Sequence, residues 1–184
     1  MQGHQAKFIF IILLTVGIAH FIFRAYQYRD NYLVKYDQKY WEHRYMISQW
    51  VIPNSKTGIG DDGLYAYAGY KYVHDGLSPI LNSPEVPPFG KYLIGLTIVV
   101  FQNQNIFGLI TSISSLTLFY LLNLHLFKVK VLAFIPVFLF SFEPLFWEQM
   151  QASYLDLLQL SFLFAIFIFV LKQKYIFESI VIGL

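Results

Sequence analysis

The stretch FIFIILLTVGIAHFIF, at residues 8–23, decides the class of fold because its sixteen residues include no formal charge. Extending it through Arg24, whose aliphatic stem can reach toward the interface, to Tyr26 gives the length of about 17 to 25 residues that a membrane-spanning helix needs. A cleaved signal peptide would need a cleavage site of small residues, whereas basic and aromatic residues follow this run. We therefore predict an uncleaved membrane anchor at residues 1–26.

The composition of the whole chain agrees with lipid as its solvent. Of the 184 residues, 57% are hydrophobic and 13% are charged, whereas soluble domains carry about 25% charged residues. The apolar residues lie in long blocks, which predicts an all-α, polytopic integral membrane protein. The absence of cysteine excludes disulfide scaffolds, zinc ribbons and cysteine nucleophiles. The net charge of +2 is too small to indicate a nucleic-acid partner.

The apolar run at residues 89–101 determines the topology. Its thirteen residues would form about 20 Å of helix, which is shorter than the roughly 30 Å hydrocarbon core. If this run crossed the bilayer, the basic residues of two later turns would face outward, against the positive-inside rule; they are Lys128, Lys130, Lys172 and Lys174. We therefore predict that the run lies along the interface and that these lysines are cytoplasmic.

The chain is accordingly divided into three parts. A long outer loop separates the anchor from later membrane-spanning helices, and the parts are residues 1–26, 27–105 and 106–184. Within the loop we predict a short helix along the interface, because Leu64, Ala68 and Tyr72 share one helical face. Asp61 and Asp62 would begin this helix, where the macrodipole favours anions.

The third part begins with a second full-length apolar run at residues 106–127. Two further helices are predicted, over 131 to about 146 and over roughly 154 to 171, with Pro144 marking a break near the end of the first. The final run, at residues 175–184, is too short to cross the bilayer. We expect from this that the sequence is the N-terminal piece of a longer membrane protein.

Acidic residues from separate parts of the sequence are predicted to gather at the outer face: the Asp61-Asp62 pair, Glu85 and Asp156. Carboxylates at a membrane surface can act as general bases or as metal ligands. Each also has a simpler interpretation. Asp61 can cap a helix, Asp156 can be a solvated residue in the first turn of a helix, and Glu85 can be a solvated loop residue.

The segment PEVPPFGK, at residues 84–91, combines three unusual features. Its paired prolines remove two backbone donors and force an extended entry into the next element. Gly90 permits a close approach of another group. Lys91 puts a cation at the membrane surface, where it can meet a lipid phosphate or serve as an anchor that snorkels.

Together these motifs resemble the N-terminal part of the protein O-mannosyltransferases and of the aminoarabinose lipid A transferases, which are GT-C glycosyltransferases. The resemblance rests on DDGLY at 61–65, PPFGKYLIGL at 87–96 and SYLD at 153–156. Residues 175–184 resemble the start of the family's Gly-Leu helix, so the similarity covers about 55–184 in order. Residues 24–56 have no role in the family, and their Tyr and Trp content suits an interface belt or sugar stacking.

The resemblance implies a GT-C-like transmembrane helix bundle with juxtamembrane helices in the first outer loop. It implies a multi-pass enzyme of the cell membrane that is similar to mannosyltransferases and acts on the non-cytoplasmic face. The donor would be a sugar on polyprenyl or dolichyl phosphate, and the acceptor a protein, lipid or glycan. Membrane lipids are expected partners and nucleic acid is not. A divalent metal ion is the only cofactor that the resemblance allows.

Residue by residue, the resemblance makes Asp61 the base or acceptor-orienting group and Asp62 the second acid. Lys91 matches a lysine that is a candidate for the donor phosphate, and Glu85 matches an acid that some relatives use toward a metal. The wider set expected at the donor also includes Tyr65, Gln151 and Asp156.

Two positions depart from the family's pattern. Val86 stands where the mannosyltransferases have His and the lipid A enzymes have Lys, and Gln151 stands where the mannosyltransferases have Arg. Because a fixed positive charge is lost, the resemblance does not imply the family's mode of phosphate binding or its sugar specificity for this chain.

The alternative class is a non-enzymatic polytopic membrane protein, such as a transporter half or an assembly scaffold, whose acids line a cavity. Ionisable residues of transporters tend to lie near the bilayer midplane, whereas the acids of this chain are predicted at the outer rim. If the chain is a transferase, we expect the 184-residue piece to be inactive alone, because the family's donor cavity also uses later helices.

Overall fold

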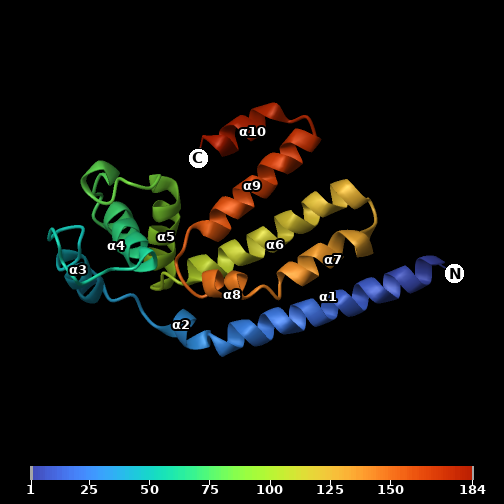
Figure 1. The fold of residues 1–184 in the computed structure, drawn as a ribbon, viewed down its shortest axis with the longest axis horizontal. Helices are drawn as coiled ribbons and strands as arrows, with labels where there is room; N and C mark the ends of the chain where they lie inside the picture. Colours follow the sequence, from blue (N-terminus) through green and yellow to red (C-terminus); the bar gives the residue numbers. More distant parts are fainter. Residues whose placement is uncertain (1, 184) are drawn as a thin grey trace. The chain divides into compact units, whose positions relative to one another are not determined.

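The computed structural model describes residues 2–183, and every regular element among them is helical (Figure 1). This confirms the all-α part of the prediction. The elements are α1 (Gln2–Gln27), α2 (Arg29–Leu33), α3 (Gln38–Met46), α4 (Asp61–His74), the 3-10 turn η1 (Pro79–Leu81), α5 (Pro88–Phe101), α6 (Ile106–Phe127), α7 (Lys130–Phe140), α8 (Pro144–Met150), α9 (Asp156–Leu171) and α10 (Tyr175–Ile182).

Two of these helices are long and apolar enough to cross a membrane, α1 over His4–Gln27 and α6 over its whole length. The bent pair α7 and α8 would give a third span if it is counted as one. α5 and α9 are apolar but have only 14 and 16 residues, below the roughly 17 that a span needs. The chain is therefore a helical protein with two or three helices suited to a membrane.

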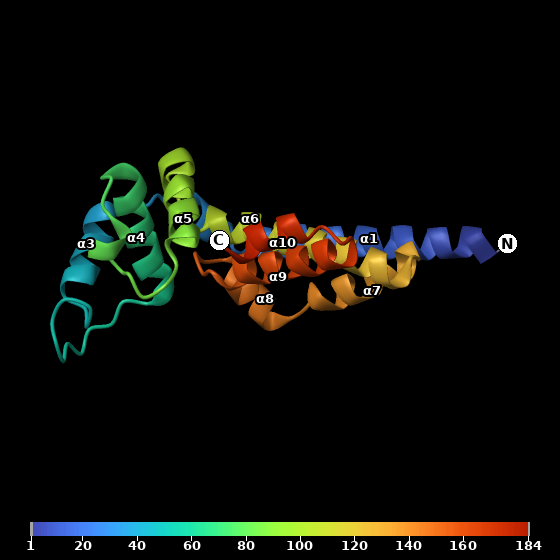
Figure 2. The same cartoon turned by 90° about the horizontal axis from the view of Figure 1, so that it is seen from above.

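The chain forms two compact units, and each is described by itself. The first contains residues 1–29, 110–150 and 156–184, and the second contains residues 30–109 and 151–155. Within the first unit α1 packs on α7, and α9 packs on both α8 and α10; Figure 2 shows α9 and α10 side by side. Serine hydroxyls join α6 to α9: Ser115 Oγ donates to Leu157 O and lies 2.8 Å from Ser161 Oγ. Such polar contacts are common between membrane helices.

The helix predicted over 131–146 is wrong in its extent, because the structure breaks it earlier. α7 ends at Phe140, and α8 begins at Pro144 with a bend of 74° between them. Proline lacks an N–H and disfavours helical geometry at the residue before it, so it starts a helix more readily than it continues one. Pro144 therefore opens a new helix instead of closing the old one. The next helix, α9, begins at Asp156, two residues later than predicted.

In the second unit α4 and α5 lie side by side (Figure 2). Their backbones come into close contact at two glycines, Gly69 and Gly95. A Cβ added to Gly95 would lie 2.6 Å from the carbonyl carbon of Gly69 and 2.7 Å from Val73 Cγ2. Only glycine leaves room for this approach. α4 begins at the predicted Asp61, and its buried surface extends beyond the predicted face to Ala66 and Tyr67. α4 is therefore the core of the second unit.

The turn after α5 forms hydrogen bonds with the first residues of the second unit. Gln102 ends α5 in the left-handed conformation, and its carbonyl accepts a hydrogen bond from the Tyr36 amide at 2.7 Å. Asn103 is 2% exposed, and its amide nitrogen donates to the carbonyls of Asn31 and Val34. This polar turn thereby fixes the chain segment that leads to α3.

Candidate functional site

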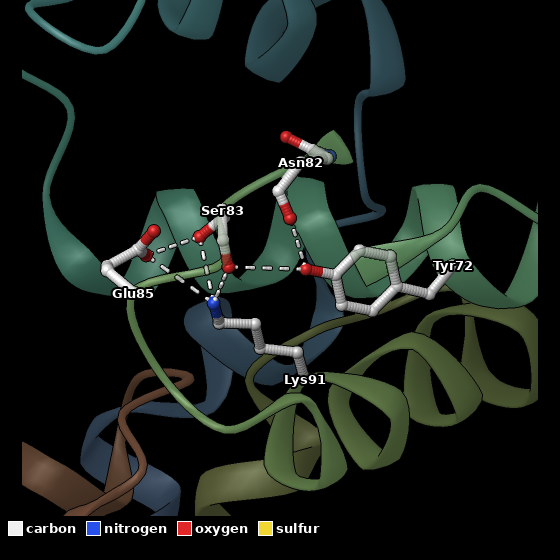
Figure 3. A network of polar contacts seen from close by, with 5 residues as sticks. All are labelled: Tyr72, Asn82, Ser83, Glu85 and Lys91. Carbon is white, nitrogen blue, oxygen red and sulfur yellow. Dashed lines mark hydrogen bonds and ion pairs between the residues drawn. The ribbon is translucent and has the colours of Figure 1, made fainter. Parts of the chain in front are cut away.

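Lys91 lies in the first turn of α5 and is completely buried, with 0% of its surface exposed. Its ammonium donates to the carbonyl oxygen of Ser83 and, at 2.9 Å, to the Ser83 hydroxyl. Glu85 Oε1 lies 3.4 Å from the same nitrogen (Figure 3). A buried charge is costly unless it is paired and hydrogen-bonded. The side chain therefore holds the Ser83–Glu85 loop against α5.

Three further contacts complete this arrangement. Ser83 Oγ donates to Glu85 Oε1 at 2.5 Å, and the Tyr72 hydroxyl donates to the carbonyl oxygen of Asn82 and lies 3.4 Å from that of Ser83. Figure 3 shows the side chains of Tyr72 and Lys91 reaching the loop that carries Asn82, Ser83 and Glu85. We call the five residues the lysine network: Tyr72, Asn82, Ser83, Glu85 and Lys91. Ser83 has a φ of +56°, which turns the loop sharply at the point where Lys91 reaches it.

The charges of the lysine network act on one another. Burial lowers the pKa of Lys91, while the nearby Glu85 carboxylate opposes this effect. Burial alone would raise the pKa of Glu85, but hydrogen bonds from Ser83 and the backbone, together with Lys91, hold that pKa below its ordinary value. Burial, aided by the Glu85 charge, raises the pKa of Tyr72 to about 12. At neutral pH Glu85 is therefore ionised and Tyr72 keeps its proton.

The acidic pair stands at the beginning of α4. Gly60 occupies the N-cap position, and Asp61 is the first residue of the helix and is exposed. Asp61 is thus not the capping residue, although its charge is favourable in the first turn. Asp62 is half-buried, and its backbone carbonyl accepts a hydrogen bond from Ser153 Oγ at 2.8 Å. This bond ties residues 151–155 to the start of α4.

Tyr65 brings the two predicted motifs together. It lies one turn after Asp61, so both side chains share a face of α4. The Lys91 ammonium lies 5.5 Å from the centre of the Tyr65 ring, which is within the range of a cation–π contact. The acidic motif at 61–65 and the lysine motif at 87–96 therefore meet in one unit.

The other predicted site residues have different surroundings. Gln151 belongs to the second unit, where its side-chain oxygen accepts a hydrogen bond from Asn31 Nδ2 at 3.3 Å. Asp156 belongs to the first unit, where it opens α9 and is exposed. That is the position expected for a solvated residue in a first turn. The roles predicted for both residues in donor binding stay predictions.

Among the side chains that the structure describes, those of residues 4–174, 177 and 179–183, no three His, Asp or Glu lie together so that they could hold a metal ion. Glu85, the predicted ligand, has the Lys91 ammonium at 3.4 Å, and a positive charge at that distance disfavours a second cation. The surroundings of Glu85 therefore do not fit a metal site. Metal binding by Glu85 stays a prediction, and no step below uses it.

A cavity of about 400 Å³ adjoins the lysine network. It combines aromatic, aliphatic and polar side chains from the end of α3, from α4 and from the loops; they are Tyr45, Trp50, Leu64, Leu81, Ser83, Pro84 and Glu85. Sequence reasoning missed most of this site. The aromatic residues of 24–56 gave only a general indication of an interface belt or sugar stacking. Nothing in the sequence marks Ser83 as a partner of Lys91, or Asn82 as a partner of Tyr72.

No protein-family model matches the chain, and comparisons with curated proteins and with solved structures find no match. A functional conclusion therefore depends on the residues and their geometry.

Proposed function

We propose that the chain belongs to a membrane glycosyltransferase of the GT-C type, similar to the protein O-mannosyltransferases and the aminoarabinose lipid A transferases. It would transfer a sugar from a polyprenyl or dolichyl phosphate donor to a hydroxyl group of a protein, lipid or glycan. The reaction would take place on the non-cytoplasmic face of the membrane. The observation that carries the proposal is the contact between Lys91 and Tyr65, because it joins the two motifs on which the resemblance depends.

Asp61 is the proposed general base. Its carboxylate is exposed at the start of α4, so an acceptor hydroxyl can reach it. Asp61 would take the proton of this hydroxyl while the oxygen attacks the anomeric carbon of the donor sugar. The bond between that carbon and the phosphate oxygen breaks, and the lipid phosphate leaves. One displacement of this kind inverts the anomeric configuration. Asp62 would be the second acid of the site and would help to orient Asp61.

Contact between Lys91 and a donor phosphate would require the loop around Lys91 to rearrange. Its ammonium is fully buried and already binds Ser83 and Glu85. A donor phosphate would reach it only by taking the place of one of these partners. In the state described here Lys91 acts as a positioning residue that shapes the loop beside Tyr65. Direct phosphate binding stays a prediction for a state in which the loop has moved.

The test is the variant Asp61→Asn in the full-length protein, assayed in membranes with radiolabelled sugars on polyprenyl phosphate. General-base catalysis typically contributes 10² to 10⁴ in rate, so we expect a loss of at least about a hundredfold. The matched control is Glu148→Gln, which neutralises an exposed acid on α8 and should leave transfer unchanged. Normal transfer by Asp61→Asn at equal protein amount would refute the role of Asp61. A wild-type protein that accepts none of the donors would favour the transporter or scaffold class.

A further inference from the structure

The cavity beside the lysine network is lined by two aromatic side chains, Tyr45 and Trp50, from a loop whose backbone is held by serine hydroxyls. Ser48 is completely buried, and its hydroxyl donates to the Tyr45 carbonyl at 2.7 Å and accepts from the Trp50 amide at 3.3 Å. Ser55 Oγ donates to the Ile47 carbonyl at 2.6 Å and closes the same loop. These bonds order the backbone that carries Tyr45 and Trp50, and both residues line the cavity.

These aromatic rings present surface that is costly to leave in water. The Tyr45 ring stacks on Tyr67, with ring centres 4.6 Å apart, and Tyr45 also lines the cavity. Trp50 is 46% exposed, although an indole gains free energy when it is covered. A ligand with a flat apolar face would cover this ring without any rearrangement of the fold.

The polar side of the cavity selects among ligand charges. Glu85 and Ser83 line it, and the Glu85 charge is already balanced by the Lys91 ammonium at 3.4 Å. A cationic ligand would therefore gain little net attraction, and an anionic ligand would meet the carboxylate directly. A neutral ligand with several hydroxyl groups can instead donate hydrogen bonds to the carboxylate. An alkyl chain would offer no donor to the part of the Glu85 carboxylate that Ser83 and Lys91 do not already use.

We propose that this cavity binds a neutral sugar ring. Its apolar C–H face would stack on Trp50 and Tyr45, and its hydroxyl groups would donate to Glu85. A volume of about 400 Å³ lies within the range of small-molecule pockets. The inference goes beyond the proposed function, because Tyr45 and Trp50 lie outside the part of the chain that resembles the transferases. It does not depend on sugar transfer.

Binding is tested by titrating the purified full-length protein, in a detergent without a sugar headgroup, with methyl glycosides of mannose, glucose, galactose and N-acetylglucosamine. Saturation-transfer NMR and tryptophan fluorescence report the complex. We expect saturable binding of at least one glycoside. Trp50→Ala should weaken it about tenfold, which corresponds to roughly 1.4 kcal/mol. Since Trp50 is half-exposed, this variant should keep the fold.

Val51→Ala is the matched control, because Val51 is 44% exposed, adjoins Trp50 and does not line the cavity; its affinity should equal that of the wild type. The proposal is overturned if no glycoside binds, if Trp50→Ala binds as well as the wild type, or if choline or a fatty acid competes more strongly than sugars. Saturable glycoside binding that Trp50→Ala weakens, together with no transfer from any donor by the wild-type protein, would refute the proposed function and leave the sugar pocket standing.

Discussion

Replacing Lys91 with methionine would remove the only ammonium of the lysine network while keeping a side chain of similar length. The variant leaves Glu85 without its counter-charge and the Ser83 carbonyl without its strongest donor. Removing one partner of a fully buried ion pair costs about 3 to 5 kcal/mol. Here the Glu85 side chain is 30% exposed and can regain water, so the loss of stability should be smaller. We take it to be that of losing hydrogen bonds to a charged group, about 1.5 to 3 kcal/mol.

We therefore expect Lys91→Met to lower the free energy of unfolding by about 2 to 3 kcal/mol. For a chain of this size that is a decrease in Tm of roughly 4 to 12 °C. Thermal unfolding of the detergent-solubilised protein, followed by circular dichroism, measures it. The matched control is Lys71→Met, because the Lys71 side chain is 15% exposed where that of Lys91 is 0% exposed, and its partners Glu42 and Asp75 are 40% and 33% exposed. Ion pairs of this kind contribute about 0 to 1 kcal/mol.

Two results would refute this reasoning. If Lys91→Met unfolds at the wild-type temperature, the ammonium is not held in the protein interior. If Lys71→Met is destabilised as much as Lys91→Met, burial is not what distinguishes the two lysines. Combining Lys91→Met with Glu85→Gln adds a further check, because residues that contact each other should show a combined loss smaller than the sum of the two single losses.

Three further predictions concern packing, pH and topology. Gly95→Val should destabilise the second unit by about 1 to 3 kcal/mol through overpacking, whereas Gly58→Ala should have little effect because nothing lies within 4 Å of the added atom; thermal unfolding compares them. The pKa of Glu85 is lower in the folded state than its ordinary 4.5, so the stabilisation it gives is present above that value and is lost as acidification passes through the folded pKa. A denaturation series from pH 6 to pH 3 should therefore show a slope that Glu85→Gln reduces. Because the chain has no cysteine, His74→Cys should react with an impermeant thiol reagent from outside, and Lys128→Cys only after permeabilisation; reaction of both from the same side would contradict the predicted topology.

The apolar runs of the sequence predicted several elements closely. Residues 106–127 form α6 with the predicted ends, and the proline-led run at 89–101 forms α5, which begins one residue earlier at Pro88. Hydrophobic blocks and proline act locally, so their effects can be read from neighbouring residues. Even here the prediction failed at 131–146, because Pro144 is compatible with the end of one helix and with the beginning of the next.

The candidate site was less accessible to sequence reasoning, because its contacts join residues that are distant along the chain. Lysine is seldom buried completely, so the motif at 87–96 indicated a surface cation. What buries Lys91 is a loop whose backbone carbonyl at Ser83 points at it, and no residue type encodes that direction. The hydrogen bond between Ser153 and Asp62 is likewise a tertiary contact, and it draws residues 151–155 into the second unit.

The glycine contact between α4 and α5 has a mechanical consequence. Because the two backbones touch at Gly69 and Gly95, no layer of side chains separates the helices at this point. We therefore expect α4 and α5 to move together as one rigid pair. Any displacement that frees Lys91 has to be absorbed by the connecting residues 75–87, which contain the left-handed Gly76 and Ser83. The same connecting segment also contains Glu85, the acidic partner of the lysine.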